Sequence, residues 1–335
     1  MTGTWRTSRF VIDLSRPQVM GIVNVTSDSF SDGGAHASTQ SALRHCEELI
    51  RQGADILDIG GESTRPGSPA VSLDDELARV IPVVREAVRL GVPLSIDTYK
   101  PEVMRPVLDL GADIVNDVWA LRQPGALAAV AQHSSCGICL MHMHRDPQTM
   151  QAAPMAGDVV PMVAEFLTRR ADALRELQIE PSRIVLDPGI GFGKTVAQNF
   201  ALLGRQRALL DAGYPLLAGW SRKSSLGAVS GIETAGERMV PSVAAALLAV
   251  ERGASIVRVH DVRDTVAALA VWRAMRASEQ QVFPEERTTT LHYSISAPTA
   301  FAVPWDGPRS RPTSCCAWRM PWAACSNGPR SARPC

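Results

Sequence analysis

Short apolar runs and segments of helical spacing alternate eight times along this chain, and this alternation restricts its possible folds more than any other feature. Apolar runs of this length are typical of strands buried on both faces of a parallel sheet. We expect strands at 18–25, 55–60, 93–97, 113–117, 137–142, 184–187, 215–219 and 255–259. We expect helices at 41–52, 73–90, 102–110, 126–132, 159–177, 200–212, 236–252 and 262–275.

Eight strand–helix repeats over roughly 260 residues match an α/β fold of the (β/α)8 TIM barrel type in number and size. A doubly wound open sheet is the alternative. Its dinucleotide-binding form carries G-x-G-x-x-G after the first strand, and no such sequence follows the first predicted strand here. The alternation therefore favours the barrel.

Polar side chains stand at the carboxyl end of every predicted strand. In chain order they are Asn24, Asp58, Asp97, Asn116, Asp117, His142, Asp187, Ser221, Arg222, Lys223, Arg258, His260 and Asp261. The active sites of TIM barrels form at this face, from the ends of several strands. Helix capping or a strand-end hydrogen bond would explain any one of these residues. It does not readily explain all eight ends together, although Asp58 and Asp117 fit a structural role equally well.

The segment 24–34, which follows the first predicted strand, combines an amide, carboxylates and hydroxyls with the aromatic Phe30. Oxygen-bearing side chains of these kinds can bind a cation or an anion. A loop that only reversed the chain would be shorter and would not need the phenylalanine. The segment therefore predicts a binding loop.

The balance of charges argues against nucleic acid or a membrane as a partner, because Lys+Arg and Asp+Glu number 34 each. No apolar run approaches the length of a membrane-spanning helix, and residues 1–16 lack the apolar core of a secretory signal. Cys46, Cys136 and Cys139 suit reduced thiols in a cytoplasmic protein. Cys136 and Cys139 form a single C-x-x-C, which we interpret as small buried residues rather than a metal or redox site.

Eight collinear motifs resemble dihydropteroate synthase, and the resemblance extends over about residues 10–277. The motifs are GIVNVT with SFSDGG at 21–34, DIGGESTRPG at 58–67, SIDT at 95–98, ND at 116–117, LMHM at 140–143, DPGIGFGK at 187–194, SRKS at 221–224 and RVHD at 258–261. Two positions depart from the family pattern: Ser27 replaces a usual proline, and His144 replaces a usual glutamine.

The resemblance implies a transferase of folate biosynthesis that works as a homodimer with Mg²⁺. It joins a 7,8-dihydropterin bearing a methylene pyrophosphate to p-aminobenzoate, and pyrophosphate leaves. For the pterin, it implies binding by Asp97, Asn116, Met141, Asp187, Lys223 and Arg258. Asp97, Lys223, Arg65 and Arg258 are the residues that it implies in catalysis.

The resemblance also implies where the rest of the substrates bind. Pyrophosphate would contact Asn24, Thr64, Arg65, Arg258 and His260. The Mg²⁺ ion would be held by Asn24 and Asp32 and would arrive with the pyrophosphate, because one amide is a weak magnesium site. The p-aminobenzoate would contact Phe30, Thr64, Pro66, Phe192, Lys223 and Ser224.

Other functions remain open at this stage. A methyltetrahydrofolate-dependent methyltransferase would share the acids that read the pterin edge, but it would not need 29–34 or 221–224. A catalytically silent pterin-binding paralogue is the second alternative. The stretch 189–195 lacks the spacing of a phosphate-binding loop. His142 and His144 could hold a metal, although lining of the pocket is the better interpretation.

The character of the sequence changes at about residue 280. Residues 281–335 contain eight prolines, four cysteines and no lysine, and they show no helical or strand periodicity. Such a segment cannot assemble a core, so we expect a synthase domain at 1–278 and a disordered tail at 279–335. Out-of-frame translation of GC-rich DNA or an arginine-rich binding arm would give a similar composition.

Overall fold

The barrel predicted from the sequence is confirmed. In the computed structural model the described residues are 3–25, 34–63, 67–146, 149–150 and 152–279, with the side chains of 34–37 left aside. Eight parallel strands close into a ring in the order β10-β3-β4-β5-β6-β7-β8-β9. The domain boundary expected after residue 278 stays a prediction, because 280–335 lie outside the described residues.

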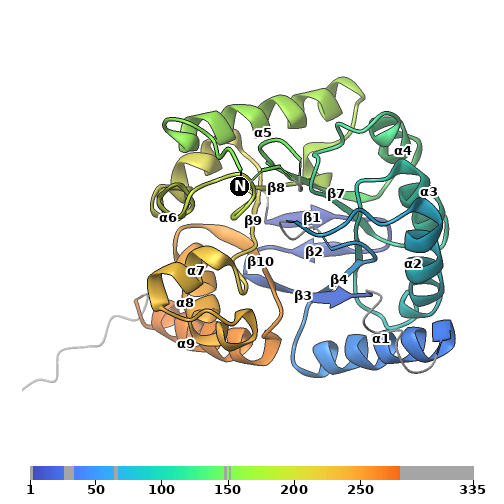
Figure 1. Cartoon of the computed structure of the whole chain (residues 1–335), viewed down its shortest axis with the longest axis horizontal. Coiled ribbons are helices and arrows are strands. Elements are labelled where there is room, and N and C mark those ends of the chain that lie inside the picture. The colour runs from blue at the N-terminus through green and yellow to red at the C-terminus, as the bar shows by residue number, and fades with distance from the viewer. Residues whose placement is uncertain (1–2, 26–33, 64–66, 147–148, 151, 280–335) are drawn as a thin grey trace, which may run out of the picture. The chain divides into compact units, whose positions relative to one another are not determined.

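All eight predicted barrel strands are present, each within one residue of its predicted ends. They are β3 (Gln18–Asn24), β4 (Ile56–Gly60), β5 (Leu94–Asp97), β6 (Ile114–Asp117), β7 (Gly137–Met141), β8 (Ile184–Asp187), β9 (Leu216–Ala218) and β10 (Ala254–Val259). The α-helices on the outside of the ring are α1 (Gly34–Arg51), α2 (Leu73–Ala87), α3 (Pro101–Asp109), α4 (Ala126–Gln132), α5 (Val159–Glu176), α6 (Val196–Gly204), α7 (Ser224–Ser230), α8 (Met239–Glu251) and α9 (Val262–Ser278) (Figure 1). Among the described helices, none has the length and apolar content that crossing a membrane requires.

Two predicted helices are shorter than expected. The predicted helix 200–212 is α6 followed by the 3-10 helix η3 (Gln206–Ala212), and α6 starts early because Thr195 and Gln198 form a capping box. The predicted helix 236–252 consists of the 3-10 turn η4 (Ala235–Glu237) and α8. The sequence pattern did not predict α7, because its seven residues are too few to show periodicity.

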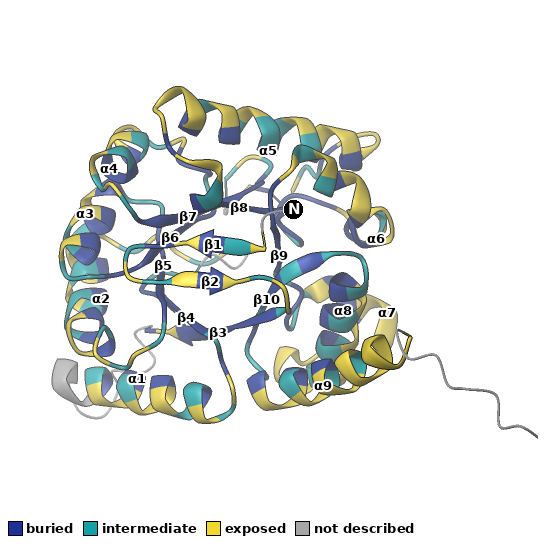
Figure 2. Cartoon of the chain, turned by 180° about the vertical axis from the view of Figure 1, so that it is seen from behind, coloured by how far each residue is buried: buried dark blue, intermediate teal, exposed yellow. Residues whose placement is uncertain are grey.

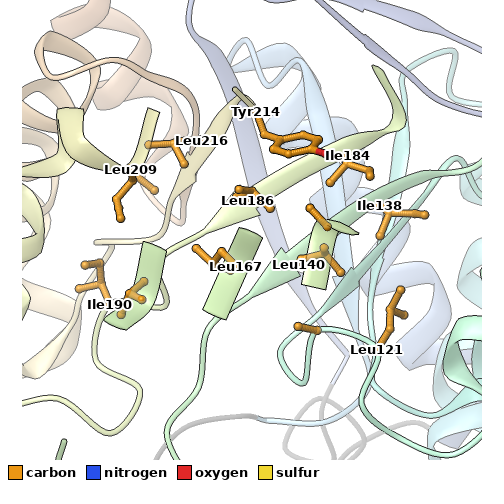
Figure 3. Packing of buried hydrophobic residues seen from close by; sticks show 14 of the residues in the cluster. Leu121, Ile138, Leu140, Leu167, Ile184, Leu186, Ile190, Leu209, Tyr214 and Leu216 are labelled. Carbon is orange, nitrogen blue, oxygen red and sulfur yellow. The ribbon is translucent and has the colours of Figure 1, made fainter. Parts of the chain in front are cut away.

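Each barrel strand is buried on both sides, so its two faces meet different partners. The outward side chains pack on the helices: Leu167 of α5, for example, lies beside Leu140 of β7 and Leu186 of β8 (Figure 3). Figure 2 shows the helices buried toward the strands and exposed on the opposite side. The inward side chains fill the barrel, and in several strands they change from apolar to polar toward the carboxyl end.

A hairpin that the sequence analysis missed closes the amino-terminal end of the barrel. Its strands, β1 (Thr4–Arg6) and β2 (Val11–Asp13), lie across the ring in Figures 1 and 2. Trp5 is fully buried among inward side chains of the barrel strands, and its indole nitrogen donates to the carbonyl of Arg183 at 2.9 Å. Three-residue strands are too short to show the alternation that identifies a strand.

Because Trp5 of this hairpin is buried in the barrel, Trp5→Ala should lower the free energy of unfolding by about 3–5 kcal/mol, the range for truncating a large buried aromatic residue. Urea unfolding followed by circular dichroism measures it. The matched control is Val11→Ala on the same hairpin, where the side chain is 65% exposed and the effect should stay within about 0.5 kcal/mol. Equal stability of the two variants would mean that the hairpin does not support the barrel.

Candidate active site

One cavity of about 380 Å³ opens where the strand ends converge. This cavity is lined by every described residue that the resemblance assigned to substrate or metal binding: Asn24, Asp97, Asn116, Met141, Asp187, Phe192, Lys223, Ser224, Arg258 and His260. The other candidates, Phe30, Asp32, Thr64, Arg65 and Pro66, lie outside the described residues. A larger hollow of about 560 Å³ lies on the flank between α5 and η3, and it contains none of the strand-end groups.

The alternation of strand side chains explains how the polar groups reach one place. In β4, Ile56 joins the apolar layer inside the barrel and Asp58, two residues on, reaches the Arg258 guanidinium. Ile256 and Arg258 repeat the pattern in β10. Since side chains two apart share a face of a strand, β6, β8 and β10 each contribute an apolar residue to the packed interior and then a polar one to the cavity.

A half-buried arginine joins three strands at the floor of the cavity. The Arg258 guanidinium donates from Nε to Asp58 Oδ2 at 2.5 Å and from Nη2 to Asp97 Oδ2 at 2.7 Å. Burial opposes the charge of Arg258, but the two carboxylates outweigh it and raise the pKa of this guanidinium. Asn116 Nδ2 also donates to Asp58 Oδ2, at 3.2 Å. Asp58 therefore positions Arg258 and Asn116, and in the described part of the chain no loop amide donates to it.

Asp97 holds an unsatisfied oxygen toward the site. Burial raises the pKa of this carboxyl to about 7, against the opposing effect of Arg258, and Asp58 and Glu76 raise it further. Its Oδ1 atom is buried, and no partner for it exists among the described residues. Two carboxylates around one guanidinium leave an excess of negative charge, so the cavity floor is suited to a cationic ligand.

A glycine-rich turn presents Asp187. The backbone nitrogen of Gly189 donates to Asp187 Oδ1 at 2.7 Å, and burial raises the pKa of this carboxyl. Gly189 has φ +67°, and a Cβ atom there would lie 1.8 Å from the carbonyl oxygen of His142. Only glycine can occupy the position, because it tolerates both the left-handed backbone and the close approach. The turn thus fixes the direction of the Asp187 side chain.

Lys194 holds the same turn from behind. Its ammonium donates to the carbonyls of Gly189 at 2.8 Å and Phe192 at 3.1 Å, and it contacts His142 Nδ1 at 2.9 Å. Burial lowers the pKa of Lys194 to about 7. Burial and Lys194 together lower the pKa of His142 to about 2, so this imidazole is neutral and accepts from Lys194.

The prediction that His142 and His144 line the pocket is therefore wrong. Neither belongs to the lining of the cavity, and His142 supports the turn of Asp187 instead. Asp117 is also structural: its carboxylate accepts from the backbone nitrogens of Trp119 and Leu121, both at 2.7 Å. Cys136 and Cys139 are free and buried, as we expected, and burial raises the pKa of both thiols.

Cationic and aromatic groups line the cavity next to the glycine-rich turn. Lys223 Nζ lies 4.3 Å from the centre of the Phe192 ring, and Ser224 begins α7 directly after it. Ser221 Oγ lies 2.9 Å from His260 Nδ1. This wall therefore presents an ammonium, an imidazole and a hydroxyl beside a flat apolar surface, a combination suited to an aromatic acid and a phosphate.

A half-buried lysine, Lys100, anchors the segment that leads into residues 64–66. Lys100 Nζ donates to Glu62 Oε2 at 2.5 Å, to Glu76 Oε2 at 2.5 Å and to the carbonyl of Val71 at 2.8 Å. The hydroxyl of Tyr99 donates to Glu62 Oε1 at 3.1 Å. Lys100 thus holds residues 62 and 71, which lie on the two sides of the segment where Thr64, Arg65 and Pro66 are predicted to contact substrate.

Several lining residues were not predicted. Ile22, Val118, Met150 and Ile190 add an apolar wall, while Arg222, Ala235 and Arg238 extend the rim. Ile22 and Val118 were detectable, since each occupies a strand or strand-end position two residues from a polar candidate. Met150 reaches the cavity from the long connection after β7, where no sequence pattern marks it.

Comparison with known proteins gives one consistent result. Residues 20–260 match the family described as pterin binding enzyme. A dihydropteroate synthase of Neisseria meningitidis serogroup B is 51% identical over 276 residues, which are 81% of this chain and 97% of that relative. The dihydropteroate synthase of Escherichia coli K12 is 46% identical over 270 residues, which are 80% of this chain and 95% of that relative.

Solved structures agree. The dihydropteroate synthase of Xanthomonas albilineans with 4-aminobenzoic acid has a TM-score of 0.77 at 49% identity, covering 83% of this chain and 99% of that one. That of Burkholderia cenocepacia complexed with 7,8-dihydropteroate has a TM-score of 0.76 at 53% identity, covering 84% and 99%. The matched segment 20–260 contains every described residue of the candidate site that the resemblance assigned.

The excess of negative charge around Arg258 predicts that Asp97→Asn becomes more stable relative to wild type as the pH rises. The folded-state pKa of Asp97 lies above the ordinary value of 3.8, so this carboxyl destabilises the fold increasingly as the pH rises from about 4 through 7. The difference in free energy of unfolding between Asp97→Asn and wild type should therefore shift by about 2 kcal/mol in favour of the variant when the pH is raised from 5.5 to 8. Denaturant titrations at the two pH values measure the gain. The exposed carboxylate variant Asp74→Asn is the control, and an equal pH dependence in both variants would contradict this account of the floor.

Proposed function

This chain belongs to the pterin-binding enzyme family, among its dihydropteroate synthases, and we propose that the cavity condenses a (7,8-dihydropterin-6-yl)methyl diphosphate with p-aminobenzoate to give 7,8-dihydropteroate and pyrophosphate. One observation carries the proposal. Buried carboxylates at Asp97 and Asp187 and cationic groups at Lys223 and Arg258 line the same cavity of about 380 Å³. The substrate needs both, since its pterin ring offers N–H groups and its diphosphate is an anion.

The pterin is recognised through its amide-and-amine edge. Asp187 is an acceptor-only group when ionised and can take two hydrogen bonds from that edge. Asn116 contributes its amide oxygen, because its NH2 group already donates to Asp58. Lys223 donates to the pterin carbonyl and ring nitrogen, Met141 packs near the ring, and Arg258 lies against the ring face.

Bond breaking precedes bond making. The C–O bond to the diphosphate breaks with both electrons leaving on the oxygen, and the pterin methylene becomes a cation stabilised by the ring. The negative floor formed by Asp97 stabilises that cation, while Arg258 and Arg65 stabilise the departing charge. The amine of p-aminobenzoate then attacks the methylene carbon and loses a proton. No covalent enzyme intermediate is needed.

The p-aminobenzoate binds on the aromatic wall. Its ring lies by Phe192 and the stem of Lys223, and its carboxylate meets Ser224. The proposal also includes Phe30, Thr64 and Pro66. The Lys100 contacts to Glu62 and Val71 support it, because they tie down both sides of the segment that contains Thr64 and Pro66.

The diphosphate binds Asn24, Thr64, Arg65, Arg258 and His260. Among the described residues no group of three or more acidic, histidine or cysteine side chains could hold a metal ion, and the amide oxygen of Asn24 is the hard donor at this edge of the cavity. Such a set fits a Mg²⁺ ion that shares phosphate oxygens and keeps its waters, with Asp32 as a second protein donor. When bound, the ion would neutralise charge on the diphosphate.

We propose a homodimer in the cytoplasm as the working form. Exposed apolar side chains gather on the three neighbouring helices α7, α8 and α9: Val229, Val240, Leu248, Val271 and Met275. An apolar surface of this kind supports association with a second copy. The three free cysteines of the barrel, Cys46, Cys136 and Cys139, support a reducing compartment.

The test of the function is synthesis itself. The full chain with Mg²⁺ should release pyrophosphate from the dihydropterin diphosphate and form dihydropteroate only when p-aminobenzoate is added. A catalytically silent paralogue would bind the pterin without product. A methyltransferase would ignore p-aminobenzoate and act on methyltetrahydrofolate. Either of these results would overturn the proposal.

Recognition of the pterin edge predicts a binding defect in Asp187→Asn. An amide must present donors to the pterin where the carboxylate accepts, so pterin affinity should fall by about 2 kcal/mol or more. Calorimetry with a non-reactive pterin measures it. The control is Asp117→Asn, which changes another buried strand-end carboxylate that does not line the cavity and should leave pterin affinity unchanged. Equal affinity for the pterin in wild type and Asp187→Asn would rule out the assignment.

A further inference from the structure

Ser221 and His260 make two contacts with each other at the edge of the cavity. The backbone nitrogen of His260 donates to Ser221 Oγ at 3.1 Å. The same Oγ lies 2.9 Å from Nδ1 of the His260 ring. The Ser221 side chain is 7% exposed, and both residues line the cavity. These contacts link the loop after β9 to the residue that directly follows β10.

The hydrogen atoms of this pair can be assigned from its hydrogen bonds. Ser221 Oγ uses one lone pair for the backbone N–H of His260, and its own hydrogen needs an acceptor because the hydroxyl is buried. In the described part of the chain, the only recorded acceptor within reach is Nδ1 of His260. If Nδ1 carried a proton, it would donate to Oγ and the hydroxyl hydrogen would be left without an acceptor.

We propose that Ser221 is a positioning residue that holds the neutral His260 ring in the tautomer with its proton on Nε2. The role of that proton rests on the proposed function. A ring that accepts at Nδ1 presents an N–H donor at Nε2, and a departing diphosphate consists of acceptor oxygens. The opposite tautomer would turn a lone pair toward those oxygens. Ser221 therefore makes His260 a donor to the leaving group without requiring a proton from solvent.

The first test observes the tautomer directly. In the full chain labelled with ¹⁵N-histidine, long-range proton–nitrogen spectra distinguish a protonated ring nitrogen from one that accepts a hydrogen bond. The His260 signals are identified by their loss in His260→Gln. We expect Nε2 protonated and Nδ1 unprotonated in wild type and in Ser221→Thr, and a mixture of tautomers in Ser221→Ala. Protonated Nδ1 in the neutral wild-type ring would overturn the proposal.

The second test measures the consequence with inorganic pyrophosphate and Mg²⁺ as the probe. Calorimetry should give roughly tenfold weaker binding in Ser221→Ala, corresponding to one lost hydrogen bond to an anion, and near wild-type binding in Ser221→Thr, which keeps the hydroxyl. Wild-type affinity in Ser221→Ala would overturn the proposal. If Ser221→Ala does not fold, the spectra of the wild type and of Ser221→Thr still test the assigned tautomer.

The control is Ser242→Ala. Ser242 is a buried serine that accepts from the backbone nitrogen of Arg222, next to Ser221, but has no recorded contact with His260. It should keep the Nε2–H tautomer, whereas a general loosening of the loop would alter His260 in both alanine variants and overturn the specific role of Ser221. The tautomer spectra do not depend on the proposed function, so a failure of that function would appear in the synthesis assay and in wild-type pyrophosphate binding but not in the spectra.

Discussion

The pairing of Arg258 with Asp58 and Asp97 is the interaction on which the rest of the site depends. It joins β10 to β4 and β5 by side chains inside the barrel, and Asn116 of β6 attaches to the same Asp58. Burying one cation with two anions is unfavourable for the fold by itself. In the proposed reaction this excess of negative charge would stabilise the transient cation, so the arrangement that lowers stability would suit that reaction.

The apolar, tightly packed layer beneath the polar floor offsets the unfavourable burial of its charges. Met20, Ile56, Ile114, Val185 and Ile256 fill the interior below the charged groups. In β4, β6, β8 and β10 the inward side chains thus change from apolar to polar within two residues. The supporting contacts continue outward through Lys194 and Lys100, which fix the turns on either side of the cavity by donating to backbone carbonyls and carboxylates.

The sequence was sufficient for those features that follow from periodicity or from long motifs. Continuous apolar runs predicted β3 to β10, and strand ends such as Asp187 and Arg258 predicted the cavity. It was insufficient where short elements depend on tertiary contacts: β1 and β2 become strands because Trp5 enters the barrel, and α7 has seven residues. His142 shows a second limit. A histidine at a strand end can point toward a lysine behind the turn, and only the fold reveals Lys194 there.

The hairpin of β1 and β2 also bears on the order in which ligands can enter and leave the cavity. The hairpin packs against the apolar layer inside the barrel, so the described part of the cavity is closed at its amino-terminal end. Asp97 and Arg258 line the cavity from the strands themselves, whereas Phe192 follows β8 and Ser224 begins α7 after β9. A ligand that occupies the floor must enter before one that covers it and must leave after it. With the pterin bound at the floor and p-aminobenzoate at Phe192 and Ser224, as we propose, the pterin would bind first and the pterin end of the product would leave last.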